Sequence, residues 1–114
     1  MRIWGLVLVW AAPVAASAAC LEVLESDYEK QAPDNGYAEI VWVATIENQC
    51  AASHDAYLDF KMLSENGNLV AKDLAAEVVP PGRMDIAGSM HLAERDLAAA
   101  VASEVSISGH ERPQ

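Results

Sequence analysis

The feature that most constrains the fold is a hairpin predicted over residues 56–74. Residues 56–63 alternate, and the apolar side chains that share one face are Ala56, Leu58, Phe60 and Met62. This period of two is typical of a strand with one buried face, because successive side chains point to opposite sides of a sheet. Asn66-Gly67 then lies in a polar turn, and both residues tolerate the positive φ of tight hairpins. A return strand over residues 69–74 completes the hairpin.

Further strands are predicted on both sides of this hairpin. Residues 38–47 form the clearest core strand, and Pro80-Pro81-Gly82 marks a corner before another alternating run. The other strands are expected over residues 21–26, 76–79, 83–92 and 101–108, with a helical turn over residues 94–99. About seven short antiparallel strands predict an all-β, immunoglobulin-like β-sandwich. A small barrel is the main alternative, because alternation does not determine how sheets close.

The 114 residues are enough for one domain. Residues 1–19 combine a basic start, an apolar run and small residues, so we predict a secretory signal peptide cleaved after Ala18 or Ala19. An uncleaved anchor is the alternative, but the apolar core is short for a span of about 20 residues. The expected domain covers residues 20–108, and residues 109–114 are predicted to be a disordered tail.

Cys20 and Cys50 are the two cysteines of the sequence. In an exported chain, an even number of cysteines without a CxxC motif predicts one disulfide. Antiparallel pairing of residues 21–26 with residues 38–47 places Cys20 opposite Cys50, as a clip across neighbouring strands. The alternative is a lipoprotein acylated at Cys20, although the aliphatic residue usual three positions before a lipidated cysteine is missing. We therefore expect a periplasmic or secreted protein.

The net charge of the chain excludes some classes of binding partner. The chain carries 7 Lys and Arg against 17 Asp and Glu, a formal net charge of −10. Without a basic cluster, electrostatic binding of nucleic acid or of an anionic membrane is disfavoured. We expect no nucleic acid partner and no stable membrane insertion once the leader is removed.

No catalytic or cofactor motif is recognised. Ser53-His54-Asp55 are adjacent in a predicted loop, whereas catalytic triads are assembled from separate segments, and no GxSxG motif occurs. Neighbouring acidic residues are expected on a chain this acidic, and acid–base catalysis needs a cleft that perturbs their pKa values. The sequence predicts a protein that is not an enzyme and has no cofactor.

A metal site is the competing hypothesis. His54, His91 and His110 lack metal-ligand spacing and are predicted to lie on the surface. Met84, Met90 and His91 are soft ligands of the kind that exported copper carriers use. The two methionines fall on the apolar face of one predicted strand and His91 on the other, so methionine as core filler is favoured.

Recognition of another protein is the preferred hypothesis. Tyr28 and Tyr37 flank the predicted loop over residues 27–37, and aromatic residues on loops make efficient contacts. Trp42 is expected in the core beside the disulfide, which disfavours a carbohydrate-binding module. The predicted role is that of an accessory or assembly subunit that uses loops or an exposed strand edge. Handling of copper by Met and His is the alternative function.

The segment FKMLSENG, residues 60–67, resembles the motif of the FxLYD family of small extracytoplasmic bacterial domains. Phe60 and Gly67 match the motif, while Met62, Leu63 and Ser64 stand for its leucine, tyrosine and aspartate. The preceding WVATIENQC, the following Val-Pro-Pro-Gly turn and the closing Val-x-x-x-Val-x-Ile run are also similar, so the resemblance extends from residue 38 to residue 108. It implies an immunoglobulin-like sandwich, no defined activity and no catalytic residues.

Overall fold

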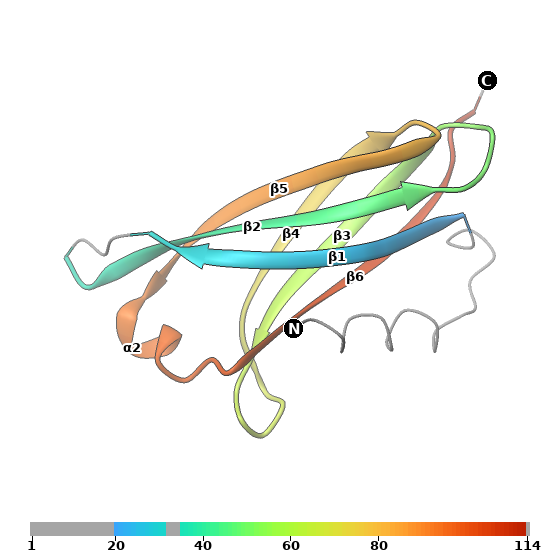
Figure 1. Ribbon diagram of the computed structural model, residues 1–114. Coiled ribbons are helices and arrows are strands. Elements are labelled where there is room, and N and C mark those ends of the chain that lie inside the picture. Colours follow the sequence, from blue (N-terminus) through green and yellow to red (C-terminus); the bar gives the residue numbers. More distant parts are fainter. Residues whose placement is uncertain (1–19, 32–34, 114) are drawn as a thin grey trace.

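The computed structural model describes residues 20–31 and 35–113. The predicted signal peptide, residues 1–19, lies outside the described residues. The described chain is almost entirely strand, as Figure 1 shows. Its elements are β1 (Leu21–Lys30), β2 (Tyr37–Asn48), β3 (His54–Leu63), β4 (Leu69–Val79), β5 (Gly82–Ala93), α2 (Glu94–Leu97) and β6 (Ala102–Glu111).

The strands form two antiparallel sheets of three strands each. The front sheet has the order β1-β2-β5 and the back sheet the order β4-β3-β6. In Figure 1 the front sheet crosses in front of the back sheet. Because the strands pair through their backbones only within each sheet, the described chain is a β-sandwich and not a closed barrel. The predicted all-β sandwich is confirmed.

The core lies between the two sheets and is centred on Trp42 of β2 and Phe60 of β3. Their rings stack with centroids 5.2 Å apart and planes 3° from parallel. Tyr28 of β1 meets the edge of Phe60 at 6.0 Å. Gly88 of β5 lies opposite Trp42, and a Cβ atom there would lie 2.7 Å from the indole ring. The front sheet therefore accommodates the indole only because residue 88 has no side chain.

The Cys20–Cys50 disulfide, whose Cα atoms are 5.3 Å apart, joins the ends of β1 and β2 within the front sheet. The backbone N–H of Gln49 donates to the carbonyl of Cys20, which extends the β1–β2 ladder to the disulfide. The predicted clip across neighbouring strands is confirmed.

Three expectations change in the structure. Residues 69–79 form one strand rather than two, so six strands replace about seven. Tyr28 belongs to β1, which continues to Lys30, and not to a loop. The expected tail is wrong for residues 109–111, which continue β6. These residues continue the strand because they pair with residues 54–56 of β3. Gly109 fits there because a Cβ atom would collide with the Asp55 carbonyl oxygen.

The described residues contain a short helix, α2, after β5 (Figure 1). It matches the helical turn predicted there. None of the helices within residues 20–31 and 35–113 is long and apolar enough to cross a membrane.

Candidate functional site

The outer face of the back sheet carries exposed apolar side chains that stand side by side. Leu74, Ala76 and Val78 alternate along β4, and Tyr57 of β3 lies directly opposite Ala76. Tyr57, Leu74 and Val78 are 46%, 63% and 39% exposed. We call these four residues the apolar strip. Exposed apolar groups that gather on one face mark interaction sites more often than scattered ones do.

One end of the apolar strip is bordered by a small charged cluster. Asp55, which lies opposite Val78, pairs with His110 at 3.4 Å and with Arg112 at 3.5 Å. The His110 ring also contacts the Tyr57 ring, with centroids 5.9 Å apart. The His110 ring, paired with Asp55, thus packs against the Tyr57 ring at this end of the apolar strip.

The rest of this outer face has mixed charge. Lys61 of β3 lies between Lys72 of β4 and Glu104 of β6. Asp59 lies next to Leu74 across the β3–β4 pair. Positive and negative side chains are thus both present around the strip, which is typical of the polar rim of a protein interface.

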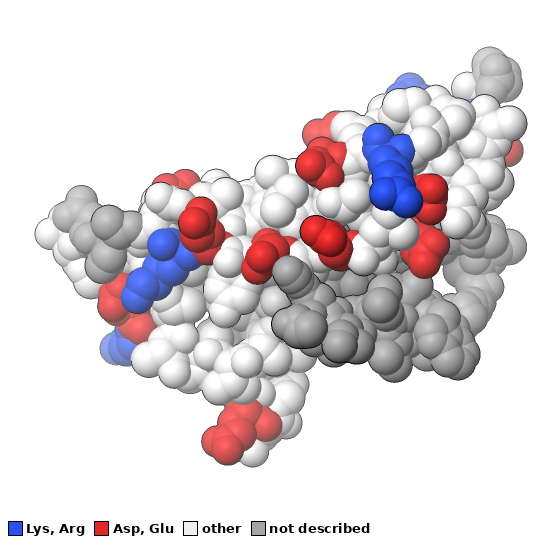
Figure 2. Space-filling model, viewed as in Figure 1, with Lys and Arg blue, Asp and Glu red and all other residues white. Residues whose placement is uncertain are grey.

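The outer face of the front sheet is different, because carboxylates dominate it. Figure 2 views this side and shows acidic residues spread over it with few basic ones. We call it the acidic face. The strand registers place seven acidic residues there: Glu22, Glu25, Asp27, Glu29, Glu39, Glu47 and Asp85.

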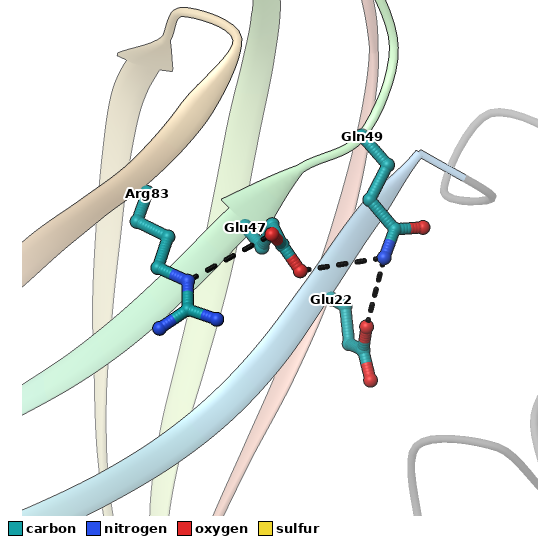
Figure 3. Close-up of polar contacts among 4 residues, drawn as sticks. All are labelled: Glu22, Glu47, Gln49 and Arg83. Atoms are coloured by element: carbon teal, nitrogen blue, oxygen red, sulfur yellow. Dashed lines mark hydrogen bonds and ion pairs between the residues drawn. The ribbon is translucent and has the colours of Figure 1, made fainter.

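Figure 3 shows the end of the acidic face that adjoins the disulfide. Arg83 of β5 pairs with Glu47 of β2 at 3.7 Å. The Gln49 amide donates to Glu47 at 3.3 Å and to Glu22 of β1 at 3.4 Å. All these groups lie at the surface, where such pairs contribute little stability. Their main effect is to link the ends of the three strands of the front sheet.

The two tyrosines predicted as partner contacts differ in their placement. Tyr37 is 56% exposed at the start of β2. Tyr28 is half-buried and its ring packs on Phe60, so its predicted exposure on a loop is wrong. A hydrophobic ring that packs in the core is less available to a partner. Of the pair, Tyr37 has the exposure that a contact residue needs.

The copper ligands of the alternative hypothesis do not converge. Met84 and Met90 pack against the core, each opposite a buried isoleucine of β2. Six residues of strand separate them by roughly 20 Å. His91 is exposed on the acidic face, where it lies opposite Glu39 in the strand register. A single ion therefore cannot contact all three side chains in this fold.

His54 does not lie on the surface, and that prediction is wrong. Its side chain is 5% exposed, and Nδ1 lies 3.0 Å from the carbonyl oxygen of Ala52. Asp55 points to the opposite face of β3, where it meets His110. Ser53, His54 and Asp55 therefore do not form a nucleophile, base and orienting acid.

The sequence reasoning missed the apolar strip. The sequence contains a pattern that indicates it, because Leu74, Ala76 and Val78 are apolar residues at alternate positions. Tyr57 falls among the alternate positions of β3 that are otherwise polar. A strand whose odd-numbered and even-numbered positions are both apolar is either buried on both faces or exposes one apolar face. The register with β3 determines which of the two applies here.

The comparisons with known proteins support the fold alone. No protein-family model matches the sequence, and no curated protein matches it. The chain is similar in structure to a β-glucuronidase from glycoside hydrolase family 2 and to a family 2 glycosyl hydrolase from Bacteroides cellulosilyticus DSM 14838. Their TM-scores are 0.55 and 0.53, at 13% and 10% identity over 77% and 60% of this chain. The chain corresponds to only 11% and 10% of those two enzymes, so the similarity concerns one β-sandwich portion and no activity.

A DUF1425 family member from Shewanella sp. pv-4 is also similar. It has a TM-score of 0.49 at 15% identity, over 82% of this chain and 80% of its own. No family assignment follows from a similarity at this level.

Proposed function

We propose that this protein is an exported, non-enzymatic β-sandwich that binds another protein through the apolar strip of its back sheet. The observation that carries the proposal is the exposure of Tyr57, Leu74 and Val78 on two neighbouring strands. Tyrosine is enriched among the residues that contribute most to binding energy in protein interfaces, and the burial of apolar side chains such as Leu74 and Val78 favours association. Export is supported by the disulfide, which is typical of oxidising compartments.

The arrangement of charge supports this choice of face. The acidic face carries seven carboxylates and would have to desolvate many of them in an interface. The outer face of the back sheet offers apolar area at its centre and both signs of charge around it. A partner is therefore expected to present an apolar surface with acidic groups near Lys61 and Lys72 and basic groups near Asp59.

Paired variants of matched residues test the proposal. Val78 on the apolar strip and Val43 on the acidic face are 39% and 38% exposed. Affinity capture from intact cells would compare the tagged wild type with Val78→Lys and Val43→Lys. We expect one or more partners to be lost with Val78→Lys and retained with Val43→Lys. Once such a partner is purified, Val78→Lys should bind it at least about tenfold more weakly than the wild type does.

Two results would contradict the proposal. One is equal capture by all three proteins, and the other is loss of partners with Val43→Lys alone. Circular dichroism and the unfolding midpoint of each variant serve as the control for folding, and both variants are expected to match the wild type. The lysine side chain is suited to this comparison because its stem tolerates an exposed strand position while its charge opposes burial.

A further inference from the structure

We propose that Cys20, Cys50 and His54 form a redox-controlled site for a soft d10 cation such as Zn²⁺, which opens when the disulfide is reduced. The two sulfur atoms and one ring nitrogen of His54 lie within 4.8 Å of one another. Two thiolates and an imidazole are a donor set of the kind that zinc prefers, and they leave a fourth position for water or an incoming ligand.

The backbone around the site is held by contacts other than the disulfide. The buried side chain of Asn48 accepts from the Cys50 N–H at 3.0 Å and donates to the carbonyls of Ala52 and Val79, each at 2.9 Å. The Gln49 N–H holds the carbonyl of Cys20 at 2.8 Å. Both cysteines are therefore positioned by hydrogen bonds that do not involve their sulfur atoms.

The contacts of His54 leave one ring nitrogen for the proposed metal ion. Its Nδ1 lies 3.0 Å from the Ala52 carbonyl oxygen, which can only accept, so this contact places the ring proton on Nδ1. The tautomer leaves a lone pair on Nε2. Metal-binding histidines commonly donate their second nitrogen to a backbone carbonyl, because this fixes the ring and strengthens the ligand.

The surroundings of the site suit a cation. His54 is buried, whereas Cys20 and Cys50 are half-buried and remain accessible to a reductant and an ion. Glu22 and Glu47, joined through Gln49, stand on the adjoining end of the acidic face. Their negative charge raises the local concentration of divalent cations.

The redox step needs a dithiol as the reductant. One thiolate of the dithiol attacks a cysteine sulfur, the Sγ–Sγ bond breaks, and a mixed disulfide forms. The second thiol of the reductant then displaces the protein, which leaves two cysteine thiols and the oxidised dithiol. Binding of Zn²⁺ forms two Zn–S bonds and releases the two thiol protons to water.

Cobalt(II) reports thiolate ligation, because thiolate-to-metal charge transfer gives an absorption band that histidine or carboxylate ligation does not. The full chain without its leader would be reduced, separated from the reductant under anaerobic conditions and titrated with Co²⁺, then with Zn²⁺. We expect one equivalent of Co²⁺ to produce the band and Zn²⁺ to displace it. The oxidised protein should give no band.

His54→Asn is the decisive variant, since its amide keeps a donor at the Nδ1 position and removes Nε2. It should bind Co²⁺ at least about tenfold more weakly, while His91→Asn, which alters an exposed histidine, should bind like the wild type. Absence of the band in the reduced wild type, or equal affinity in His54→Asn, would overturn the proposal.

Circular dichroism covers the case in which reduction unfolds the chain. If the reduced protein loses its sheet signal and one equivalent of Zn²⁺ restores it, binding coupled to folding supports the site. If Zn²⁺ does not restore the signal, the proposal fails.

Discussion

The indole nitrogen of Trp42 donates a hydrogen bond to the carboxylate of Asp73 over 2.8 Å and so connects the two sheets. Asp73 lies on the inner side of β4, opposite the buried Phe60. Asp73 is half-buried, and a carboxylate withdrawn from water needs such a partner. The pair therefore joins the largest core side chain of the front sheet to the edge of the back sheet.

Removing this carboxylate is expected to destabilise the sandwich. Asp73→Ala leaves the indole N–H without its acceptor and should lower the free energy of unfolding by about 1–2 kcal/mol. Asp73→Asn keeps an acceptor and should lose less. The measurement is urea unfolding followed by the fluorescence of Trp42, the one tryptophan within the described residues. Equal midpoints for the wild type and Asp73→Ala would show that the bond contributes nothing.

A methyl group at residue 88 should be poorly tolerated. A Cβ there would lie 2.7 Å from the Trp42 ring, so Gly88→Ala has to shift the indole and is expected to cost about 1–3 kcal/mol. Ser89→Ala changes the adjacent residue, which points to the acidic face, and should stay within about 0.5 kcal/mol. The measurement is the unfolding midpoint of each variant. Equal midpoints for Gly88→Ala and Ser89→Ala would contradict the predicted clash with the indole.

Asn48 is predicted to be among the most sensitive polar residues. Its buried side chain satisfies the Cys50 N–H and the carbonyls of Ala52 and Val79, and Asn48→Ala leaves all three without that partner. We expect a loss of about 3 kcal/mol. Gln49→Ala, at the exposed next position, should lose no more than about 0.5 kcal/mol. Similar losses for the two variants would contradict the assignment of Asn48 as the organiser of this end.

The disulfide should raise the free energy of unfolding, because it closes a loop that restricts the unfolded chain. Its cysteines are 30 residues apart, which on the chain-entropy treatment corresponds to about 3–4 kcal/mol. The double variant Cys20→Ser, Cys50→Ser should show that loss in urea unfolding. Because Asn48 holds the same loop, the variant is expected to remain folded at 25 °C. Complete loss of its sheet signal would show that the hydrogen bonds alone do not hold the end.

The alternation of residues was sufficient to predict the core strands and much of the core. Phe60, Met62, Ile40 and Trp42 were placed on inner faces from their period alone, and all are buried. The disulfide followed from the number of cysteines and the pairing of two strands. These properties depend on local pattern, which a single sequence displays directly.

The features that were missed depend on partners far along the chain. Residues 69–74 and 76–79 are predicted as two strands, whereas the structure forms one strand there. The hydrogen-bond partner of its Asp73 is Trp42, which lies 31 residues away on the other sheet. The surface prediction for His54 follows from its place in a predicted loop, yet that segment is held by the Asn48 side chain, which donates to the Ala52 carbonyl. Close approaches such as that of Gly109 to Asp55 likewise appear only once the register is known.

Site-specific photo-crosslinking in intact cells tests the proposed binding face most directly. A photoreactive amino acid would replace Val78 on the apolar strip or Val43 on the acidic face, which have nearly equal exposure of 39% and 38%. We predict a discrete crosslinked protein adduct with the probe at position 78 and none at position 43. An adduct at position 43 with none at position 78, or no adduct at either position, would contradict binding through the back sheet.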